Sequence, residues 1–436
     1  MEKIVVLDFG SQYSHLICRR IREFSVYAEL VPYDISPEEL QKMNPKGIIF
    51  SGGPSSVYND DAPKPDEELF NFDLPLLGIC YGHQLIVNKF GGKVKRANKE
   101  YGSSLLSMDK NSGLLDGIGE SIRAWMSHGD EAEEIPSNFE VIGHTENSHA
   151  AAIANTDRTV FGIQFHPEVV HTERGTDILK NFVLNVCKAK QEWTMEGFVE
   201  KTVKEISEIE GNVLCGVSGG IDSTVAALLI HKAIGDRQTG VFVDNGLLRL
   251  DESKEIEDMF KNNFSLNFHR VDASEQFLSK LKGITDPEQK RKIVGEEFIQ
   301  VFTEFAKQKG PFKWLAQGTL YPDVIESGVS KGPAAVIKSH HNVGGLPEWL
   351  NLKILEPLRE LYKDEVRDVA RILGVPEKLL KRHPFPGPGL SVRIMGEITP
   401  SKLAICRKAS KIVEEELLDA GVYDKVWQAY AAVGDD

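Results

Sequence analysis

Runs of apolar residues without polar alternation recur along the first part of the chain. Residues 4–7, 47–50 and 74–79 are almost entirely apolar, a pattern typical of strands that are buried on both faces of a parallel sheet. Helix-like segments at residues 13–24 and 82–90 follow the first and the third of these runs. This alternation of strand and helix predicts a layered α/β domain.

The same alternation returns in the second part of the chain. A helix-like segment at residues 195–209 leads into an apolar run at 213–217, and another at 225–234 separates that run from one at 240–243. A further strand followed by a glycine turn is expected at residues 313–319. We therefore predict a second, doubly wound sheet.

Polar and proline-rich stretches indicate where the domains end. Residues 188–195 are polar and follow a helix-like segment, which predicts a first domain over residues 1–189. Residues 382–389 contain three prolines and two glycines, which predicts a second domain over residues 190–382 and a third over residues 383–436.

The third segment is too small to close a layer. Residues 390–394 alternate like a strand, and a helix is expected over residues 400–420. One strand and one or two helices cannot bury both faces of a layer. We expect a partial α+β unit that docks on another surface or continues in further residues.

Length and charge restrict the function. The 436 residues are too many for a single hydrophobic core. The 51 Lys and Arg against 65 Asp and Glu give a net charge of −14, which argues against a nucleic-acid surface or an anionic membrane surface. Anionic ligands must then be bound by local basic clusters, and the candidates are Lys290-Arg-Lys292 and a glycine-rich loop containing Lys338. A solvated helix face is the alternative for the first cluster.

The cysteines and the apolar runs bear on the compartment. Five cysteines are scattered without a C-x-x-C pair, so neither a disulfide framework nor a zinc site is indicated. The chain starts in a strand pattern without a signal peptide, and no apolar run approaches the ~20 residues of a membrane span. A cytoplasmic location is expected.

The stretch Val213-Leu-Cys-Gly-Val-Ser-Gly-Gly-Ile-Asp-Ser-Thr224 joins an apolar strand to a helix through small residues. Backbone N–H groups at such a helix start lack partners and can bind phosphate oxygens. Glycines let a ligand approach the main chain, and hydroxyl groups add donors. The residues concerned are Ser218, Gly219, Gly220, Ser223 and Thr224. An ordinary strand-to-helix turn with a serine cap is the alternative.

This loop lacks the lysine of the G-x-x-x-x-G-K-[ST] pattern. Asp222 stands in the loop instead. A carboxylate beside phosphates needs a cation between them, so Asp222 suggests a Mg²⁺ site.

Three strand ends in the first domain carry candidate catalytic groups. Gly78-Ile-Cys-Tyr-Gly82 has the spacing of a nucleophile elbow, with Cys80 at a helix N-terminus. Another strand ends in His166-Pro-Glu168, which places a base and a carboxylate on the same side of an extended chain. The turn Ser51-Gly-Gly-Pro54 can aim backbone N–H groups at an oxyanion.

Each of these motifs has a structural alternative when taken singly. A buried cysteine is usually a small hydrophobic residue, and a His-Pro-Glu sequence is usually a turn. His83 and His128 lie near the motifs and are expected to be structural.

Together, the three motifs resemble the class I glutamine amidotransferases in their order and spacing. The resemblance implies a thioester at Cys80, proton transfer by His166 and orientation of that base by Glu168. It further implies an oxyanion hole formed by the backbone amides of Gly53 and Tyr81. Gln84 would help to hold the glutamine substrate. The product passed onward would be ammonia.

The loop Ser-Gly-Gly-x-Asp-Ser resembles the pyrophosphate loop of the ATP pyrophosphatase family. That family cleaves ATP between the α and β phosphates and activates its substrate as an adenylate. The ATP-binding residues implied by the resemblance are Ser218, Gly219, Gly220, Ile221, Asp222, Ser223, Val243 and Gly318, with Asp222 also as the metal ligand.

Over nearly its whole length the sequence resembles the glutamine-hydrolysing GMP synthase family, through residues 318–326, 337–347 and 383–390 in addition to the motifs above. The resemblance implies two layered α/β domains, one amidotransferase-like and one a doubly wound adenine-nucleotide α-hydrolase-like sheet, plus the partial C-terminal dimerisation unit. It implies that ATP adenylates XMP at O2 with the help of Mg²⁺ and that ammonia then displaces AMP, which gives GMP and pyrophosphate. Arg291 and Arg393 would contact XMP, Lys338 would lie on a lid, and a homodimer would form through the C-terminal unit. Family members continue beyond the position of Asp436.

Other functions stay open from the sequence. One is a different ATP-driven amidation, such as NAD synthesis or tRNA modification by a related pyrophosphatase. Another is a non-catalytic regulator that keeps a glutamine-binding fold.

Overall fold

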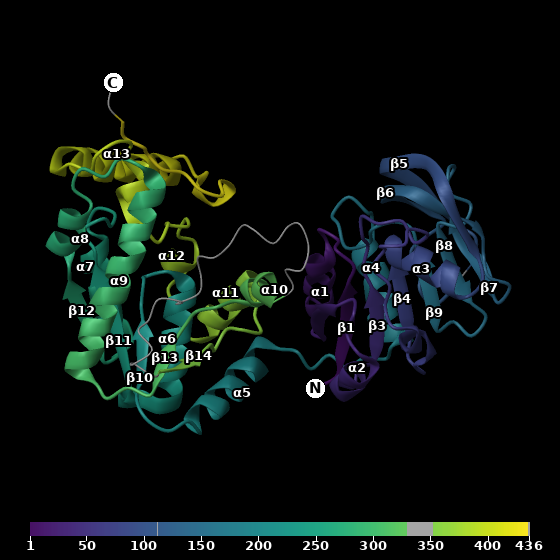
Figure 1. Cartoon of the computed structure of the whole chain (residues 1–436), viewed down its shortest axis with the longest axis horizontal. Coiled ribbons are helices and arrows are strands. Elements are labelled where there is room, and N and C mark those ends of the chain that lie inside the picture. The colour runs from purple at the N-terminus through teal and green to yellow at the C-terminus, as the bar shows by residue number, and fades with distance from the viewer. Residues whose placement is uncertain (111, 329–351, 435–436) are drawn as a thin grey trace. The chain divides into compact units, whose positions relative to one another are not determined.

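The computed structural model describes residues 1–110, 112–328 and 352–434 (Figure 1). The chain forms two compact units, Met1–Thr194 and Met195–Asp436. Both units contain a sheet flanked by helices, as the α/β fold class predicts. Residues 383–436 belong to the second of these units.

The first unit is built on a nine-stranded sheet with the strand order β2-β1-β3-β4-β9-β8-β7-β5-β6. Its strands are β1 (Lys3–Asp8), β2 (Tyr27–Pro32), β3 (Gly47–Phe50), β4 (Leu76–Ile79), β5 (Lys93–Met108), β6 (Ser121–Glu134), β7 (Phe139–His144), β8 (Ala152–Asn155) and β9 (Val160–Ile163). Its helices are α1 (Ser14–Arg22), α2 (Pro37–Met43), η1 (Glu67–Asn71), α3 (Tyr81–Lys89), α4 (Gly175–Lys180) and η2 (Asn181–Val186).

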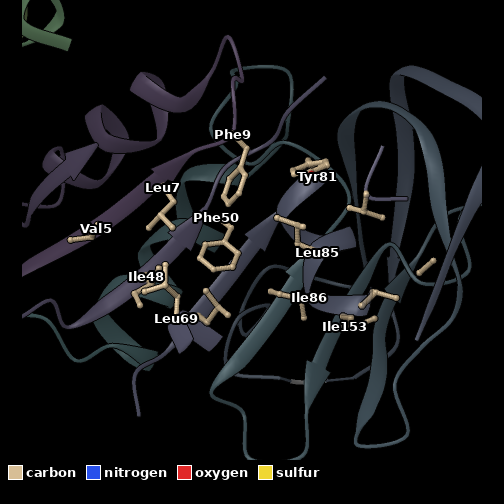
Figure 2. Close-up of a cluster of buried hydrophobic side chains, with 14 of the residues drawn as sticks. Val5, Leu7, Phe9, Ile48, Phe50, Leu69, Tyr81, Leu85, Ile86 and Ile153 are labelled. Carbon is tan, nitrogen blue, oxygen red and sulfur yellow. The ribbon is translucent and has the colours of Figure 1, made fainter. Parts of the chain in front are cut away.

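The predicted apolar runs form the parallel half of this sheet. β1, β3, β4 and β9 pair in parallel, and all four residues of both β3 and β4 are buried. Figure 2 shows Leu7, Phe9 and Phe50 of this core close to Tyr81 and Leu85 of α3. Strands that are covered on both faces have no reason to alternate, which explains the continuous apolar runs.

The other half of the sheet is antiparallel, which the apolar pattern did not predict. β8 pairs with β9 in antiparallel register, and β5 and β6 form a long antiparallel ribbon. β6 alternates between buried and more exposed residues along most of its length. Such an alternating strand covers the core with one face only.

The second unit is built on a five-stranded parallel sheet with the strand order β12-β11-β10-β13-β14. Its strands are β10 (Val213–Gly216), β11 (Gln238–Asp244), β12 (Phe268–Asp272), β13 (Trp314–Ala316) and β14 (Lys353–Leu355). Its helices are α5 (Met195–Ser207), α6 (Ile221–Ile234), η3 (Gly235–Arg237), α7 (Glu252–Asn263), α8 (Ser274–Lys280), α9 (Pro287–Lys309), α10 (Tyr321–Gly328), α11 (Lys363–Ile372), α12 (Glu377–Leu380), η5 (Gly389–Arg393), α13 (Pro400–Asp419) and η6 (Tyr423–Lys425).

Helices cover both faces of the second sheet. α5, α6 and α11 contact one another, while side chains of α8 and α9 pack with β10, β11 and β13 in one apolar cluster. Figure 1 shows the long helix α9 lying across the sheet. The strand order reverses between β10 and β13, and ligands of doubly wound sheets bind beyond the carboxyl ends of the strands at this reversal.

The prediction of a strand at residues 390–394 is wrong. Residues Gly389–Arg393 form the 3₁₀ helix η5, and Gly389 has a φ of +63°. Of the next four residues, Leu390, Ser391 and Arg393 are buried. The alternating pattern that suggested a strand therefore comes from a helical turn that is buried on more than one side. The helix predicted over residues 400–420 is confirmed as α13.

Candidate functional site

Three neighbouring strands bring the candidate groups of the first unit to one edge. β3, β4 and β9 are adjacent and parallel, so the segments that follow them emerge together. A Cβ built on Gly52 would lie 3.1 Å from His166 Cε1 and 3.6 Å from Cys80 Cβ. All three motifs therefore surround one point, and the space between nucleophile and base stays open because residue 52 is a glycine.

Cys80 occupies a tight turn between β4 and α3. Its φ of 52° is one that L-residues rarely adopt, at a cost of about 1–3 kcal/mol. A Cβ on Gly78 would lie 2.3 Å from the Gly82 carbonyl oxygen, and a Cβ on Gly82 would lie 2.5 Å from the Phe50 carbonyl oxygen. Glycine is required at both positions, and the turn has the geometry of a nucleophile elbow.

His166 and Glu168 form a buried pair beside Cys80. His166 Nδ1 lies 2.8 Å from Glu168 Oε1, and the two side chains are 5% and 0% exposed. Burial lowers the pKa of His166, but the Glu168 carboxylate and a hydrogen bond with Cys80 outweigh burial and raise the pKa to about 10. This raised pKa lets His166 hold, at neutral pH, a proton taken from the cysteine sulfur.

Segments far apart in the sequence hold the His166 ring and backbone. The Tyr13 ring lies edge-on to the imidazole at 5.3 Å between centroids. The His166 N–H donates to the Trp125 carbonyl at 3.0 Å, and Thr172 Oγ1 donates to the His166 carbonyl at 2.6 Å. No local sequence motif identifies these residues, because only the folded sheet places them beside the base.

Two buried glutamines lie behind Cys80. Gln164 Nε2 donates to Cys80 Sγ at 3.6 Å, and Gln164 Oε1 accepts from Gln84 Nε2 at 3.4 Å. Gln84 Nε2 also donates to the Asp130 carbonyl at 3.1 Å. The Gln84 residue, predicted to contact glutamine, is 3% exposed, and its amide nitrogen is engaged in these internal contacts. Gln164 was not among the predicted site residues.

The predicted oxyanion donors lie on either side of the elbow. Tyr81 opens α3 directly after Cys80, and a Cβ on Gly53 would lie 2.7 Å from the Phe9 carbonyl oxygen. In the described part of the chain, neither N–H donates to a backbone carbonyl outside its own helix or strand. Both are therefore available to a ligand oxygen.

His83 and His128 are buried, as expected of structural residues. His128 bridges the Asp130 carbonyl at 3.0 Å and Glu100 Oε2 at 3.1 Å. Burial, together with repulsion from His128 and His149, lowers the pKa of His83 to about 3. His83 is therefore neutral, and it lies against Gly162, where a Cβ would meet its Nδ1 at 2.3 Å.

In the second unit, the glycine-rich loop lies at the strand-order reversal. Ser223 Oγ accepts from the Ser218 N–H at 3.1 Å and donates to the Gly220 carbonyl at 3.0 Å. Gly219 has a φ of 77°, and a Cβ on Gly318 beyond β13 would lie 3.4 Å from the Ser223 nitrogen. The loop and the Gly318 turn therefore meet at one point. Ile221 opens α6, and Val243 lies near the end of β11.

Asp222 is paired with a lysine from a distant segment. Lys363 Nζ, at the start of α11, lies 2.6 Å from both carboxylate oxygens. The fold thus supplies at this loop the ammonium group that the loop sequence lacks. Within the described ranges no cluster of three or more His, Cys, Asp and Glu side chains could hold a metal ion. A Mg²⁺ at Asp222 would need phosphate oxygens or water as its other ligands.

A cavity of about 830 Å³ in the second unit is rich in arginine. Its wall includes Ile256, whose side chain also lies against Gly219, so the cavity borders the loop. The arginines that line it are Arg249, Arg382, Arg393 and Arg407.

Arg393 is the most buried of these arginines, at 5% exposed. Its guanidinium lies over the rings of Phe385 at 5.0 Å and Tyr430 at 4.4 Å, and it forms no ion pair with a carboxylate in the part of the chain described. Burial and the neighbouring charge of Arg249 lower its pKa. Two cations that repel each other in a cavity form a site that an anion would stabilise.

The predicted basic cluster Lys290-Arg-Lys292 is not brought to this cavity. Lys290 is 0% exposed, and its Nζ donates to the carbonyls of Ile394 at 2.7 Å and Gly396 at 2.6 Å, so its interpretation as an anion-binding residue is wrong. Arg291 is half-exposed, pairs with Glu288 at 3.2 Å and is not part of the cavity wall. Lys338 lies outside the described residues.

Known proteins resemble both units. The family described as glutamine amidotransferase class-I matches residues 5–186, and the family described as NAD synthase matches residues 193–298. The GMP synthase [glutamine-hydrolyzing] of Clostridium tetani is 52% identical over 99% of this chain and 85% of its own length. The enzyme of the same name from Alkaliphilus metalliredigens is 53% identical over 99% and 85%.

The chain belongs to the glutamine-hydrolysing GMP synthase family.

Membership in the GMP synthase family accounts for both matched domains in one chain. A solved glutamine amidotransferase from Thermotoga maritima also aligns, with 16% identity and a TM-score of 0.33 over 48% of this chain and 84% of its own. The similarity to GMP synthases along the whole chain favours this family over NAD synthases, although the second unit matches a family named for NAD synthase. None of the described helices is long and apolar enough to cross a membrane.

Proposed function

We propose that this chain converts XMP to GMP, with glutamine as the nitrogen donor and ATP as the activating substrate. The observation that carries the proposal is the presence in one GMP synthase family chain of a Cys80–His166–Glu168 group and a glycine-rich loop at a strand-order reversal. The first can release ammonia from glutamine, and the second can bind the phosphates of ATP.

In the first unit, Cys80 attacks the side-chain amide carbon of glutamine. His166 holds the proton that Cys80 releases, and it donates this proton to the departing ammonia. Glu168 keeps His166 protonated and oriented through the 2.8 Å contact at Nδ1. The N–H groups of Gly53 and Tyr81 stabilise the oxyanion, and water then hydrolyses the thioester to glutamate.

In the second unit, the loop from Ser218 to Ser223 binds the two outer phosphates of ATP. This loop contains the first residues of α6, whose N-terminal N–H groups can bind phosphate, and Lys363 adds a positive charge. Gly318 and Val243 border the nucleotide. The XMP oxygen O2 takes up the AMP group and pyrophosphate leaves, after which ammonia attacks C2 and displaces AMP.

We also propose that Asp222 holds a Mg²⁺ ion together with ATP. One carboxylate and several phosphate oxygens match the preference of Mg²⁺ for few protein ligands. The ion would neutralise phosphate charge, and Lys363 would then be released from Asp222 toward the phosphates.

The arginine-lined cavity is the proposed XMP site. Arg393 would bind the anionic nucleotide from within the cavity. The role of Arg291, which is not part of the cavity wall, stays a prediction from the family resemblance. The position of the cavity beside Gly219 supports this assignment, because XMP and ATP must react with each other.

A homodimer in the cytoplasm completes the proposal. Several large apolar side chains of the C-terminal segment are exposed, and exposed apolar surface favours association. They are Ile405, Ile412, Leu418, Trp427 and Tyr430. All five cysteines are free, as suits a reducing compartment.

The test is which nucleotide makes the protein convert ATP to AMP. The purified chain is incubated with ATP, Mg²⁺, glutamine and either XMP or nicotinate adenine dinucleotide, and the adenine products are separated. We expect AMP and pyrophosphate with XMP only. AMP formed with the dinucleotide only would instead indicate NAD synthesis, and ADP as the product would contradict the role of the loop.

A further inference from the structure

The sulfur of Cys80 has a contact that the Cys-His-Glu group does not explain. Gln164 Nε2 lies 3.6 Å from Sγ, a normal separation for an amide donor and the large sulfur atom. Gln164 is 0% exposed, and it is the residue directly after β9, two positions before His166. The same strand end thus presents both an amide and an imidazole to the nucleophile.

The hydrogen bonds fix which end of the Gln164 amide faces the sulfur. The Asp130 carbonyl can only accept, so Gln84 must present its Nε2 to it, at 3.1 Å. That same nitrogen can only donate, and it lies 3.4 Å from Gln164, which must therefore present Oε1. The Nε2 of Gln164 is left pointing at Sγ, as a donor.

We propose that Gln164 is a catalytic residue that stabilises the thiolate of Cys80, and that Gln84 is the positioning residue that orients it. This inference rests on the proposed glutaminase function of the first unit. As a thiol, Cys80 donates to the Ser127 carbonyl at 3.7 Å. Once its proton has passed to His166, that carbonyl can no longer accept from the sulfur. The Gln164 N–H and the imidazolium then become the groups that stabilise the negative charge.

The surroundings make this contact important. Cys80 and Gln164 are 5% and 0% exposed, so water cannot readily replace a lost donor. The charged and titratable groups near the sulfur are His166 and, behind it, Glu168, while His83 and the His128–Glu100 pair lie on the neighbouring elements α3, β6 and β5. A neutral amide adds stabilisation without changing the charge balance of this group.

The experiment compares Gln164→Met with the native chain. Methionine keeps the length of the side chain and removes the donor. We expect glutamine-dependent kcat to fall about 10- to 100-fold, the loss typical of a hydrogen bond to a charged group. Alkylation of Cys80 by iodoacetamide should slow, and its pH midpoint should rise, while GMP formation from free ammonia stays within about two-fold of native because the second unit is unchanged.

Two further variants keep the test decisive. Gln191→Met removes another amide–carbonyl hydrogen bond of the first unit, the 2.8 Å contact with Phe24, and should leave the alkylation profile unchanged. Gln84→Met should raise the alkylation midpoint by less than Gln164→Met does. If Gln164→Met does not fold, the pH dependence of Cys80 alkylation in Gln84→Met is the test of the inference.

An unchanged alkylation rate and pH midpoint in Gln164→Met would overturn the inference, as would an increase in KM for glutamine with no loss of kcat. An unchanged midpoint in Gln84→Met would do the same where Gln164→Met does not fold. Alkylation needs no substrate, so the result is independent of the proposed reaction. If the native chain hydrolyses no glutamine, the proposed function fails while Gln164 is still tested.

Discussion

In the first unit, the carboxyl ends of β4 and β9 hold a nucleophile, a base and a carboxylate, and the base His166 contacts both Cys80 and Glu168. In the second unit, the loop that follows β10 holds the hydroxyl groups of Ser218 and Ser223 and the carboxylate of Asp222. The hydroxyl groups form hydrogen bonds within the loop, and the carboxylate pairs with Lys363. His166 and Glu168 are 5% and 0% exposed, whereas Asp222 and Lys363 are 31% and 43% exposed. Both sites lie at the carboxyl ends of parallel strands, but only in the first are the paired side chains buried from solvent.

The difference follows from what each site must bind. Glutamine carries no phosphate, so the first site can complete its ion pair within the protein and only has to keep a gap open at Gly52. ATP brings several negative charges, so the second site needs cations that the ligand can draw away from their resting partners. The Asp222–Lys363 pair is such an arrangement.

Replacing Cys80 by alanine tests whether the two sites are chemically separate, and we expect it to have the largest effect. Glutamine-dependent GMP formation should fall by about 10⁴-fold or more, because the nucleophile is lost. Ammonia-dependent GMP formation should persist, and both are measured by following GMP. Cys187→Ala is the matched control, since burial raises the pKa of that thiol far above its usual range and keeps it unreactive. A parallel loss of both activities in Cys80→Ala would mean that the sites are not independent.

Asp222→Asn tests the open site. It removes the proposed metal ligand and leaves Lys363 without its partner, so we expect pyrophosphate release to fall by about 10²- to 10³-fold. Alkylation of Cys80 should not change. Asp236→Asn, an exposed aspartate in η3, controls for the lost charge. Normal turnover in Asp222→Asn would remove Asp222 from the mechanism.

Arg393→Met tests the arginine-lined cavity. The loss of a buried guanidinium should raise KM for XMP by about 10- to 100-fold, with KM for ATP nearly unchanged. Arg371→Met is the control, because Arg371 forms half-exposed ion pairs with Asp368 and Glu377. Steady-state kinetics with each substrate varied in turn measures both constants. Equal changes in both would indicate a general loss of structure.

The smallest effect concerns the stability of the closed site. The pKa of His166 is raised from its usual 6.5 to about 10, so the folded state holds a proton that the unfolded state loses first. This stabilisation is fully present below pH 6.5 and is lost as the pH rises through about 10. Between pH 7 and 9.5, the free energy of unfolding should fall on the order of 2 kcal/mol more in the native chain than in Glu168→Gln.

Urea-induced unfolding at a series of pH values measures this difference. Glu173→Gln, a change of an exposed carboxylate in the same segment, should keep the native pH slope. Identical slopes in the native chain and in Glu168→Gln would show that the pair does not retain the proton.

Short-range pattern was sufficient for much of the fold. Local apolar pattern and glycine position predict several elements, because the residues of each element determine its own conformation. These elements are β1, β3, β4, β10, α5, α6 and α13. The antiparallel ribbon of β5 and β6 was not predicted, since strand partners are decided by pairing across the sheet. The helix η5 was predicted as a strand because burial in a turn also produces apolar alternation.

By itself, the sequence determined the motifs: the elbow around Cys80, the His166-Pro-Glu168 strand end and the Gly219–Gly220 loop each lie within a few residues, so their local chemistry is set by neighbours along the chain. Only the tertiary structure decided which groups join them. Lys363 reaches Asp222 from 141 residues away, Tyr13 lies edge-on to the His166 ring, Gln164 is turned toward the Cys80 sulfur, and Lys290 is buried among backbone carbonyls. Such contacts depend on strand order and packing, which bring distant residues within hydrogen-bond distance and leave no trace in local spacing.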